Sequence, residues 1–160
     1  MSSWFYLLKE QGVVYGDSSL HLQTDYLYFV VEGIVIVRSK EDMHIHFICR
    51  QKGCLNIEVL AMEEFGYEYI PVGKVRILKL HRSSMQSLFT KYPKLMGRIL
   101  RQEKHVLDQM IWFSKVYRAQ NQQEELRKLY MRLRLPFSYE MFQKYVFDDI
   151  LSLGVDSNDT

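Results

Sequence analysis

Four side chains between residues 43 and 54 could bind a metal ion or carry redox chemistry. His44 and His46 alternate with apolar residues in MHIHFIC, which places both imidazoles on one face of a predicted strand. Two histidines on a strand are more typical of a charged surface than of a metal centre. Cys49 and Cys54 are the only cysteines, too few for a four-thiolate zinc or iron–sulfur site. We therefore expect no metal, no iron–sulfur cluster, and thiols that are buried in a reducing compartment.

The acidic pairs of the chain have poor geometry for acid–base catalysis. Glu63-Glu64 and Asp148-Asp149 are adjacent in sequence, so the two carboxylates of each pair point to different sides of a strand or helix. The sequence also has no nucleophile elbow, phosphate-binding loop or zinc-finger spacing. We therefore expect that the protein is not an enzyme.

The composition is that of an ordinary globular protein. The chain has 160 residues, of which 48% are hydrophobic and 25% charged, with a net charge of +2. A net charge this small does not by itself indicate a nucleic-acid-binding protein. The sequence has no apolar run long enough to span a bilayer, and its start, MSSWFYLLKE, lacks the basic flank and cleavage site of a signal peptide. We expect a cytoplasmic protein that does not bind membranes.

Up to about residue 80 the sequence predicts short strands. The stretch 26–37, YLYFVVEGIVIV, is aromatic and β-branched, and Glu32-Gly33 indicates a tight turn or a bulge within it. We assign Gly33 to a strand-to-strand turn. The sequence PVG at 71–73 indicates another turn, before a strand at 75–80. Strands at this close spacing predict a small antiparallel β-roll, a cupin-like jelly roll.

Beyond residue 80 the periodicity becomes helical. Ser83 and Ser84 can cap a short helix, and a second, long helix is expected from Pro93 to residue 118. Steps of three and four place its apolar side chains on one continuous seam, too long for a roll of about 80 residues to cover. We predict that the seam packs against the same helix of a second copy, and that Met110→Lys gives monomers. The predicted interface residues are Leu100, Leu107, Met110, Phe113 and Tyr117.

The seam stops at the polar stretch AQNQQEE, residues 119–125, and apolar positions resume at Leu126. This stretch is either a hinge or the solvated middle of one long helix. The predicted fold class is α+β. Residues 1–92 form the β-roll effector domain, 93–118 the dimerisation helix, and 119–160 a hinge and a short helical segment.

The order of these elements resembles the Crp/Fnr family of bacterial transcription regulators. LYFVVEGIVIV is similar to the family's strand-Gly-strand signature, and HRSSMQSLFTKYPKLMGRILRQ, residues 81–102, to the passage leading into its dimer helix. The resemblance implies a homodimer whose roll senses an effector and controls a winged helix-turn-helix that binds DNA. Residues 147–153 would be the first helix of that motif, Gly154 its turn, and Ser157 the start of a recognition helix that is incomplete in this chain.

Many members of this family bind a cyclic nucleotide through a Gly-Glu pair and an Arg beside a Ser or Thr. The corresponding window, residues 53–76, has no arginine before Arg76 and is acidic. Because a buried phosphate requires an arginine or several N–H donors, we predict that cyclic AMP and cyclic GMP do not bind. The protein would then be either a ligand-free activator or one that binds a small apolar or peptide-like effector in a groove between roll and helix. Aromatics at this spacing more often form core and dimer packing. The groove residues would be Phe65, Tyr67, Tyr69, Trp112, Phe113 and Tyr117.

Two alternatives stay open. The first is a stand-alone β-roll sensor or protein-interaction module. The second is a cupin-type metal enzyme, because His44-x-His46 resembles the metal site of cupins, but Arg50 and Gln51 stand where a glutamate ligand is expected. Five basic residues around the second amphipathic helix form either phosphate contacts or a solvated helix face. These are Arg118, Arg127, Lys128, Arg132 and Arg134.

Overall fold

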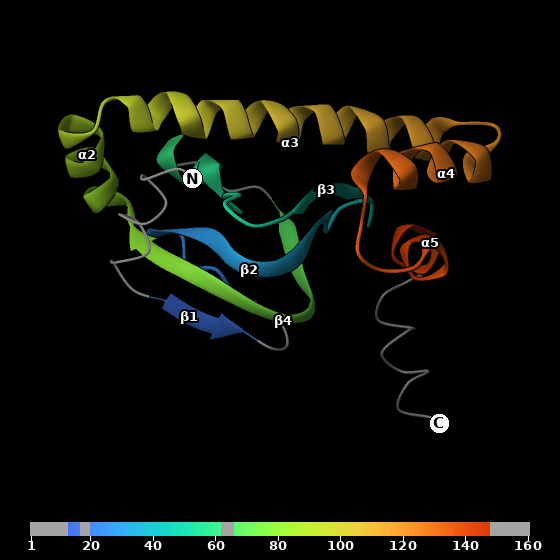
Figure 1. Cartoon of the computed structure of the whole chain (residues 1–160), viewed down its shortest axis with the longest axis horizontal. Coiled ribbons are helices and arrows are strands. Elements are labelled where there is room, and N and C mark those ends of the chain that lie inside the picture. The colour runs from blue at the N-terminus through green and yellow to red at the C-terminus, as the bar shows by residue number, and fades with distance from the viewer. Residues whose placement is uncertain (1–12, 17–19, 62–65, 148–160) are drawn as a thin grey trace.

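The computed structural model describes residues 13–16, 20–61 and 66–147 (Figure 1). Within them the strands form one antiparallel sheet in the order β1-β4-β2-β3. Helix α3 runs along the sheet, with α2 at one end and α4 and α5 at the other. The predicted α+β class is confirmed. The elements are β1 (Val13–Gly16), β2 (Tyr26–Ser39), β3 (Ile45–Cys49), the 3-10 helix η1 (Ile57–Ala61), β4 (Tyr67–His81), α2 (Arg82–Lys91), α3 (Lys94–Arg118), α4 (Gln122–Leu133) and α5 (Tyr139–Phe147).

β2 is one long strand with a bulge rather than two strands joined by a turn. Its register against β4 shifts on both sides of Glu32, and Gly33 has a φ of +99°. A Cβ at Gly33 would lie 2.7 Å from the carbonyl oxygen of Lys74, so the site requires glycine for space as well as for φ. The predicted bulge is therefore confirmed, and the strand-to-strand turn assigned to Gly33 is wrong.

The bulge changes which residues of β2 face the helices. Before it, Leu27 and Phe29 pack in a cluster with α2 and the first turns of α3. After it, Ile34 and Ile36 pack in a cluster with the end of α3, α4 and α5. Because side chains of a strand alternate between faces, the change from odd to even positions follows from the extra residue at the bulge. The opposite face of β2 lines the interior of the roll through Tyr28, Val30, Val35 and Val37.

β4 and α2 differ from the sequence prediction at their boundaries. β4 continues through the predicted turn at 71–73, where Pro71 pairs with Val35 of β2. The predicted turn does not separate two strands, because β4 pairs with β2 on both sides of Gly73, at Val72 and at Arg76. α2 begins at Arg82, and its cap is His81, whose Nδ1 accepts a hydrogen bond from the backbone N–H of Ser83 at 3.2 Å. The cap is therefore His81 and neither of the two predicted serines.

α3 covers the outer edge of β3 through two polar side chains. The Oε1 of Gln109 accepts a hydrogen bond from the N–H of Ile48 at 2.8 Å, and its Nε2 donates to the carbonyl of Ile48 at 3.2 Å. The hydroxyl of Tyr117 accepts from the N–H of Ile45 at 3.0 Å. Since an edge strand leaves backbone groups unpaired, these side chains replace a neighbouring strand and fix α3 to the roll.

The polar stretch after α3 breaks the helix, so the alternative of one long helix is wrong. α3 ends at Arg118, and α4 begins after Asn121, whose side chain accepts from the N–H of Glu124 at 3.2 Å. α4 and α5 lie at one end of the sheet (Figure 1), and their apolar side chains form one buried cluster with Ile34, Ile36, Ile45 and Ile48 of the roll. None of the described helices is long and apolar enough to cross a membrane. The predicted helix-turn-helix positions Gly154 and Ser157 lie outside the described residues.

Candidate effector cavity and helix seam

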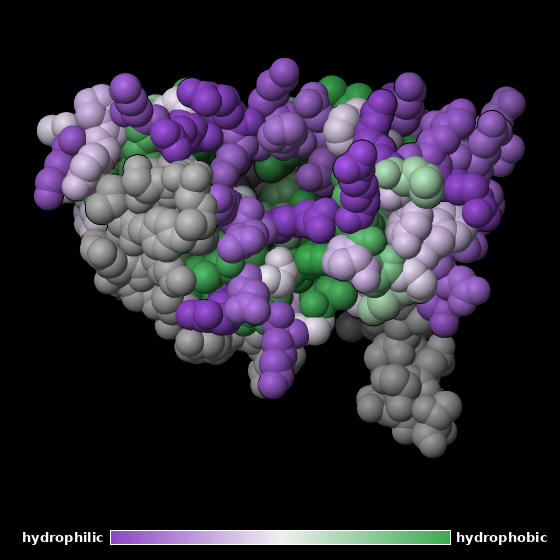
Figure 2. Space-filling model, viewed as in Figure 1, coloured by the Kyte–Doolittle hydropathy of each residue, from purple (hydrophilic) through white to green (hydrophobic). Residues whose placement is uncertain are grey.

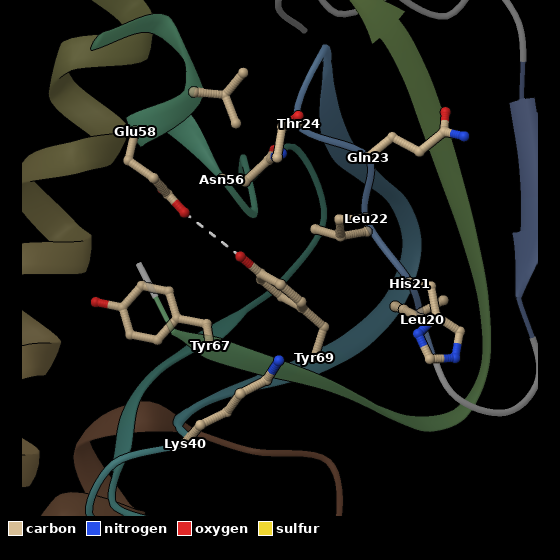
Figure 3. Close-up of a pocket in the computed structure, with 11 residues that line it drawn as sticks. Leu20, His21, Leu22, Gln23, Thr24, Lys40, Asn56, Glu58, Tyr67 and Tyr69 are labelled. Carbon is tan, nitrogen blue, oxygen red and sulfur yellow. Dashed lines mark hydrogen bonds between the residues drawn. The ribbon is translucent and has the colours of Figure 1, made fainter. Parts of the chain in front are cut away.

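A cavity of about 260 Å³ opens at the end of the roll next to η1 (Figure 3). Its wall comes from the segment 20–24 before β2, from η1 and from the start of β4. Figure 3 shows Glu58 and Tyr69 directed toward each other across it. Both polar atoms of the Asn56 side chain form hydrogen bonds within the fold. Its Oδ1 accepts from the backbone N–H of Tyr28 at 3.0 Å, and its Nδ2 donates to the carbonyl of Tyr26 at 2.9 Å. The other polar side chains of the wall are those of His21, Gln23, Thr24, Lys40, Glu58, Tyr67 and Tyr69.

Burial raises the pKa values of the carboxyl and phenol groups that line this cavity. Burial raises the pKa of Glu58 above its ordinary value, and the hydroxyl of Tyr69 donates to Glu58 at 3.5 Å. Burial and the charge of Glu58 raise the pKa values of Tyr67 and Tyr69. A site with these properties offers hydrogen bonds to a small polar or aromatic molecule.

The described wall of the cavity contains no arginine. Lys40 lines the cavity at its exposed rim. The nearby Arg38 is buried and forms an ion pair with Glu68, so its guanidinium is already committed. A phosphate here would meet one exposed ammonium and a partly buried carboxyl, which is a poor anion site.

The structure does not bring the predicted groove residues together. Tyr67 and Tyr69 line the cavity beside η1, whereas Trp112 lines a separate hollow of about 410 Å³ between α3 and α4. Phe113 is fully buried against Phe142 of α5. Phe65 lies outside the described residues. A single aromatic groove between roll and helix is therefore wrong, because Trp112 and Phe113 lie at the far end of α3, where α4 and α5 cover it.

The outer face of α3 carries large apolar side chains that the chain itself leaves exposed. Leu100 and Leu107 of the predicted seam are 59% and 58% exposed, and Met110 is half-buried. Figure 2 shows the largely hydrophilic side chains over α3, with hydrophobic patches between them at the upper edge. Phe113 is wrong as an interface residue, because it is 0% exposed within one chain. The predicted interface did not include two further exposed residues of α3, Met96 and Ile111.

Tyr117 lies at the junction of roll, α3 and α5 rather than on the outer face. Its hydroxyl donates to the carbonyl of Val146 at 3.0 Å while accepting from Ile45, and its ring stacks on His44 at 3.8 Å. Burial is the main reason why the pKa of this phenol is raised to about 12. Because these contacts are all within one chain, its assignment to the subunit interface is corrected.

A second polar contact joins the roll to the C-terminal helices. The Nη1 of Arg50 donates to the carbonyls of Leu133 and Arg134 at 2.9 and 3.3 Å. These carbonyls lie at the end of α4, where Arg134 has a left-handed φ of 52°. A cation at a helix C-terminus satisfies unpaired carbonyls and interacts favourably with the helix dipole. The turn after β3 therefore holds the end of α4.

Glu103 of α3 was missed by the sequence reasoning, although its spacing could have revealed it. It follows Leu100 by three residues and precedes Leu107 by four, which are the steps of the seam. Its side chain is half-buried. Burial, and next the charge of Glu58, raise its pKa to about 7.

The candidate metal and redox residues have ordinary roles in the structure. The Nδ1 of His44 lies 3.4 Å from the carboxylate of Asp42, and His46 Nδ1 lies 3.1 Å from the hydroxyl of Tyr67. The described residues contain no group of three or more histidines, cysteines or acidic residues that could hold a metal ion. Cys49 and Cys54 are buried free thiols whose pKa values are raised by burial, which makes them unreactive.

The basic residues near α4 are largely engaged with neighbouring side chains. Lys128 lies within 4 Å of both Glu124 and Glu125. Arg127 and Arg132 each lie 4.6 Å from an aromatic ring, those of Tyr139 and Trp112. These contacts describe a solvated helix face with aromatic stacking.

Comparisons with known proteins agree at the level of fold. No protein-family model and no curated protein matches the chain. The c-di-GMP-responsive global regulator CLP of Xanthomonas campestris superposes with a TM-score of 0.66 at 13% identity, over 96% of this chain and 91% of that one. TTHA1359, a CRP/FNR-family transcriptional regulator from Thermus thermophilus, gives 0.59 at 17% identity over 76% and 64%. A CooA mutant from Carboxydothermus hydrogenoformans gives 0.55 at 14% identity over 79% and 86%.

Because these three structures have low sequence identity to this chain, the similarity supports a shared architecture and not shared ligands. The chain therefore has the Crp/Fnr-like cyclic-nucleotide-binding fold, an α+β fold in which an antiparallel roll leads into one long helix.

Proposed function

We propose that this chain is the dimeric effector part of a Crp/Fnr-type transcription regulator and that it is not an enzyme. The observation that carries the proposal is the row of exposed apolar side chains on α3, in a chain with this fold. DNA is the proposed partner of the regulator. The stand-alone sensor or interaction module is the alternative.

The proposed interface lies along the outer face of α3. Its apolar members follow one another at steps of four, seven and three residues, which fit the seven-residue repeat of a two-stranded parallel coiled coil. Exposing such a row to water is unfavourable, at about 25 cal/mol per Å² of apolar surface, and a second α3 can cover it. The proposed members are Met96, Leu100, Leu107, Met110 and, at the flank, Ile111.

A charge placed in the seam tests this interface. Leu107→Glu introduces a carboxylate between two copies of α3, so we expect monomers at concentrations where the unmodified chain is a dimer. The matched control is Arg101→Glu, which puts the same carboxylate on an exposed position of α3 away from the seam. Sedimentation velocity measures both. A Leu107→Glu protein that stays dimeric would remove this face from the proposal and leave the stand-alone alternative in front.

We further propose that the effector of the roll is not a cyclic nucleotide and that the protein uses no cofactor. The cavity beside η1 supports this through its partly buried Glu58 and its lack of an arginine in the described wall. A small apolar or peptide-like molecule with hydrogen-bonding groups suits the cavity better. The responsiveness to c-di-GMP belongs to CLP, and the two phosphates of c-di-GMP would likewise meet no arginine in the described wall of this cavity. Calorimetric titration with cyclic AMP, cyclic GMP and c-di-GMP should show no binding, and micromolar binding of any of them would overturn the proposal.

A further inference from the structure

The seam of α3 contains one ionisable side chain at a position where its repeat calls for an apolar residue. Met96, Leu100, Glu103, Leu107 and Met110 follow one another at steps of four, three, four and three. With a rise of about 1.5 Å per residue, Glu103 lies about 4.5 Å along the axis from Leu100 and about 6 Å from Leu107. The carboxyl is therefore flanked by the two most exposed leucines of the helix.

We propose that Glu103 forms a proton-dependent polar layer in the seam, so that two copies of the chain associate in parallel with uptake of protons. The inference rests on the dimer proposed above and names how that dimer is regulated. In parallel, in-register packing each position of the seam meets its own equivalent in the second copy, so the two Glu103 side chains lie opposite each other.

The surroundings of Glu103 in a single chain offer no partner for a negative charge. Glu58 from η1 acts on it as a like charge, and Glu103 in turn raises the pKa values of the Cys49 and Cys54 thiols of the roll. These thiols are neutral. No ion pair or hydrogen bond of the Glu103 side chain is formed by the described residues. On its own helix the adjacent cation is Lys104, which is exposed.

Dimerisation adds two effects that raise the pKa of Glu103 and one that lowers it. The second Glu103 is a further like charge, and the closing seam removes water, so both effects favour the protonated form. Lys104 of the second copy can approach Glu103 from the edge of the seam and favours the ionised form. Because exposed ion pairs contribute little and an ionised carboxyl in a dry layer costs much more, proton uptake prevails. When both groups are protonated, the O–H of one carboxyl donates a hydrogen bond to the carbonyl oxygen of the carboxyl opposite.

The test is the dimer dissociation constant, measured by sedimentation equilibrium at pH 8 and pH 6. The pKa of Glu103 is already about 7 in the single chain. A further rise of one unit in the dimer, on each of the two carboxyls, makes the dimer dissociation constant about tenfold or more lower at pH 6 than at pH 8. Glu103→Gln keeps the shape and removes the charge, so its dissociation constant should change less than about threefold over this range. Asp108→Asn is the matched control, an acid-to-amide change on α3 away from the seam, and should behave like the unmodified chain.

A second substitution guards against misfolding of Glu103→Gln. Glu103→Met restores the apolar repeat and should dimerise more tightly than the unmodified chain at pH 8. Dimers whose dissociation constant is unchanged or larger at pH 6 overturn the proton layer and leave the dimer intact. The same holds if Glu103→Gln keeps the full pH response. A chain that is monomeric at both pH values overturns the proposed dimer itself.

Discussion

The hydroxyl of Tyr117 is a single atom on which the junction of roll, α3 and α5 depends. It accepts a hydrogen bond from the N–H of Ile45 and donates one to the carbonyl of Val146, each at 3.0 Å. Ile45 and Val146 are 1% and 4% exposed, so water cannot replace the hydroxyl without entering the core. Tyr117→Phe removes both bonds and keeps the ring stacked near His44.

The loss of stability expected for Tyr117→Phe follows from the two backbone groups that lose their hydrogen-bond partner. Each lost hydrogen bond is worth about 1 kcal/mol net, and a buried group without a partner costs about 1–3 kcal/mol. With two such groups and partial relaxation, we expect Tyr117→Phe to lower the free energy of unfolding by about 2–4 kcal/mol. Part of the loss should appear as earlier unfolding of the segment α4–α5, because Val146 is its contact with Tyr117.

Urea unfolding followed by far-ultraviolet circular dichroism measures this loss. The control is Tyr145→Phe on α5, which removes a half-buried phenol oxygen for which no hydrogen bond is found among the described residues. We expect a change of less than about 0.5 kcal/mol for the control. The reasoning would be refuted if Tyr117→Phe were as stable as Tyr145→Phe, since the hydroxyl would then not join the roll to α5.

Three further predictions concern the bulge, the covered edge and the cavity. Gly33→Ala should lower the free energy of unfolding by about 1–3 kcal/mol in urea, because φ is +99° and the new Cβ meets Lys74. Gln109→Met should cost about 2 kcal/mol in the same assay, because it leaves both backbone groups of Ile48 unpaired. Burial raises the pKa of Glu58 in the folded chain, so the unfolded chain releases this proton at a lower pH than the folded chain does. The free energy of unfolding that Glu58 contributes at low pH is therefore lost as the pH rises through the raised pKa. Melting temperatures across pH should therefore fall less steeply for Glu58→Gln than for the unmodified chain.

The sequence could predict the elements with a strong, long-range periodicity. The long helix expected from Pro93 to residue 118 is α3, Lys94–Arg118, because apolar steps of three and four persist through it. The interruption at Glu32-Gly33 was recognised as a break in a strand pattern. Its form as a bulge depends on β4 pairing along both halves of β2, a tertiary contact that no local signal contains.

The site was harder to predict because burial by distant elements decides it. Phe113 is apolar and close to the seam, but it lies on the face of α3 that α5 covers. Tyr67 and Trp112 are both aromatic, yet they line two separate hollows, one beside η1 and one between α3 and α4. Glu103 is charged, so a seam defined by apolar residues alone does not include it. A repeat followed by position rather than by residue type would have included it.

The most direct test of the account is disulfide cross-linking between two copies at the end of the seam. The next step of the seam after Met110 is four residues long and reaches Ser114. Lys115 is exposed and lies to the side of the seam. The native cysteines do not interfere, because Cys49 and Cys54 are buried and their pKa values are raised. Under mild oxidation we predict that Ser114→Cys forms a covalent dimer near twice 19.2 kDa and that Lys115→Cys does not. If Ser114→Cys remained a monomer, or if both variants cross-linked equally, the parallel seam along α3 would be contradicted.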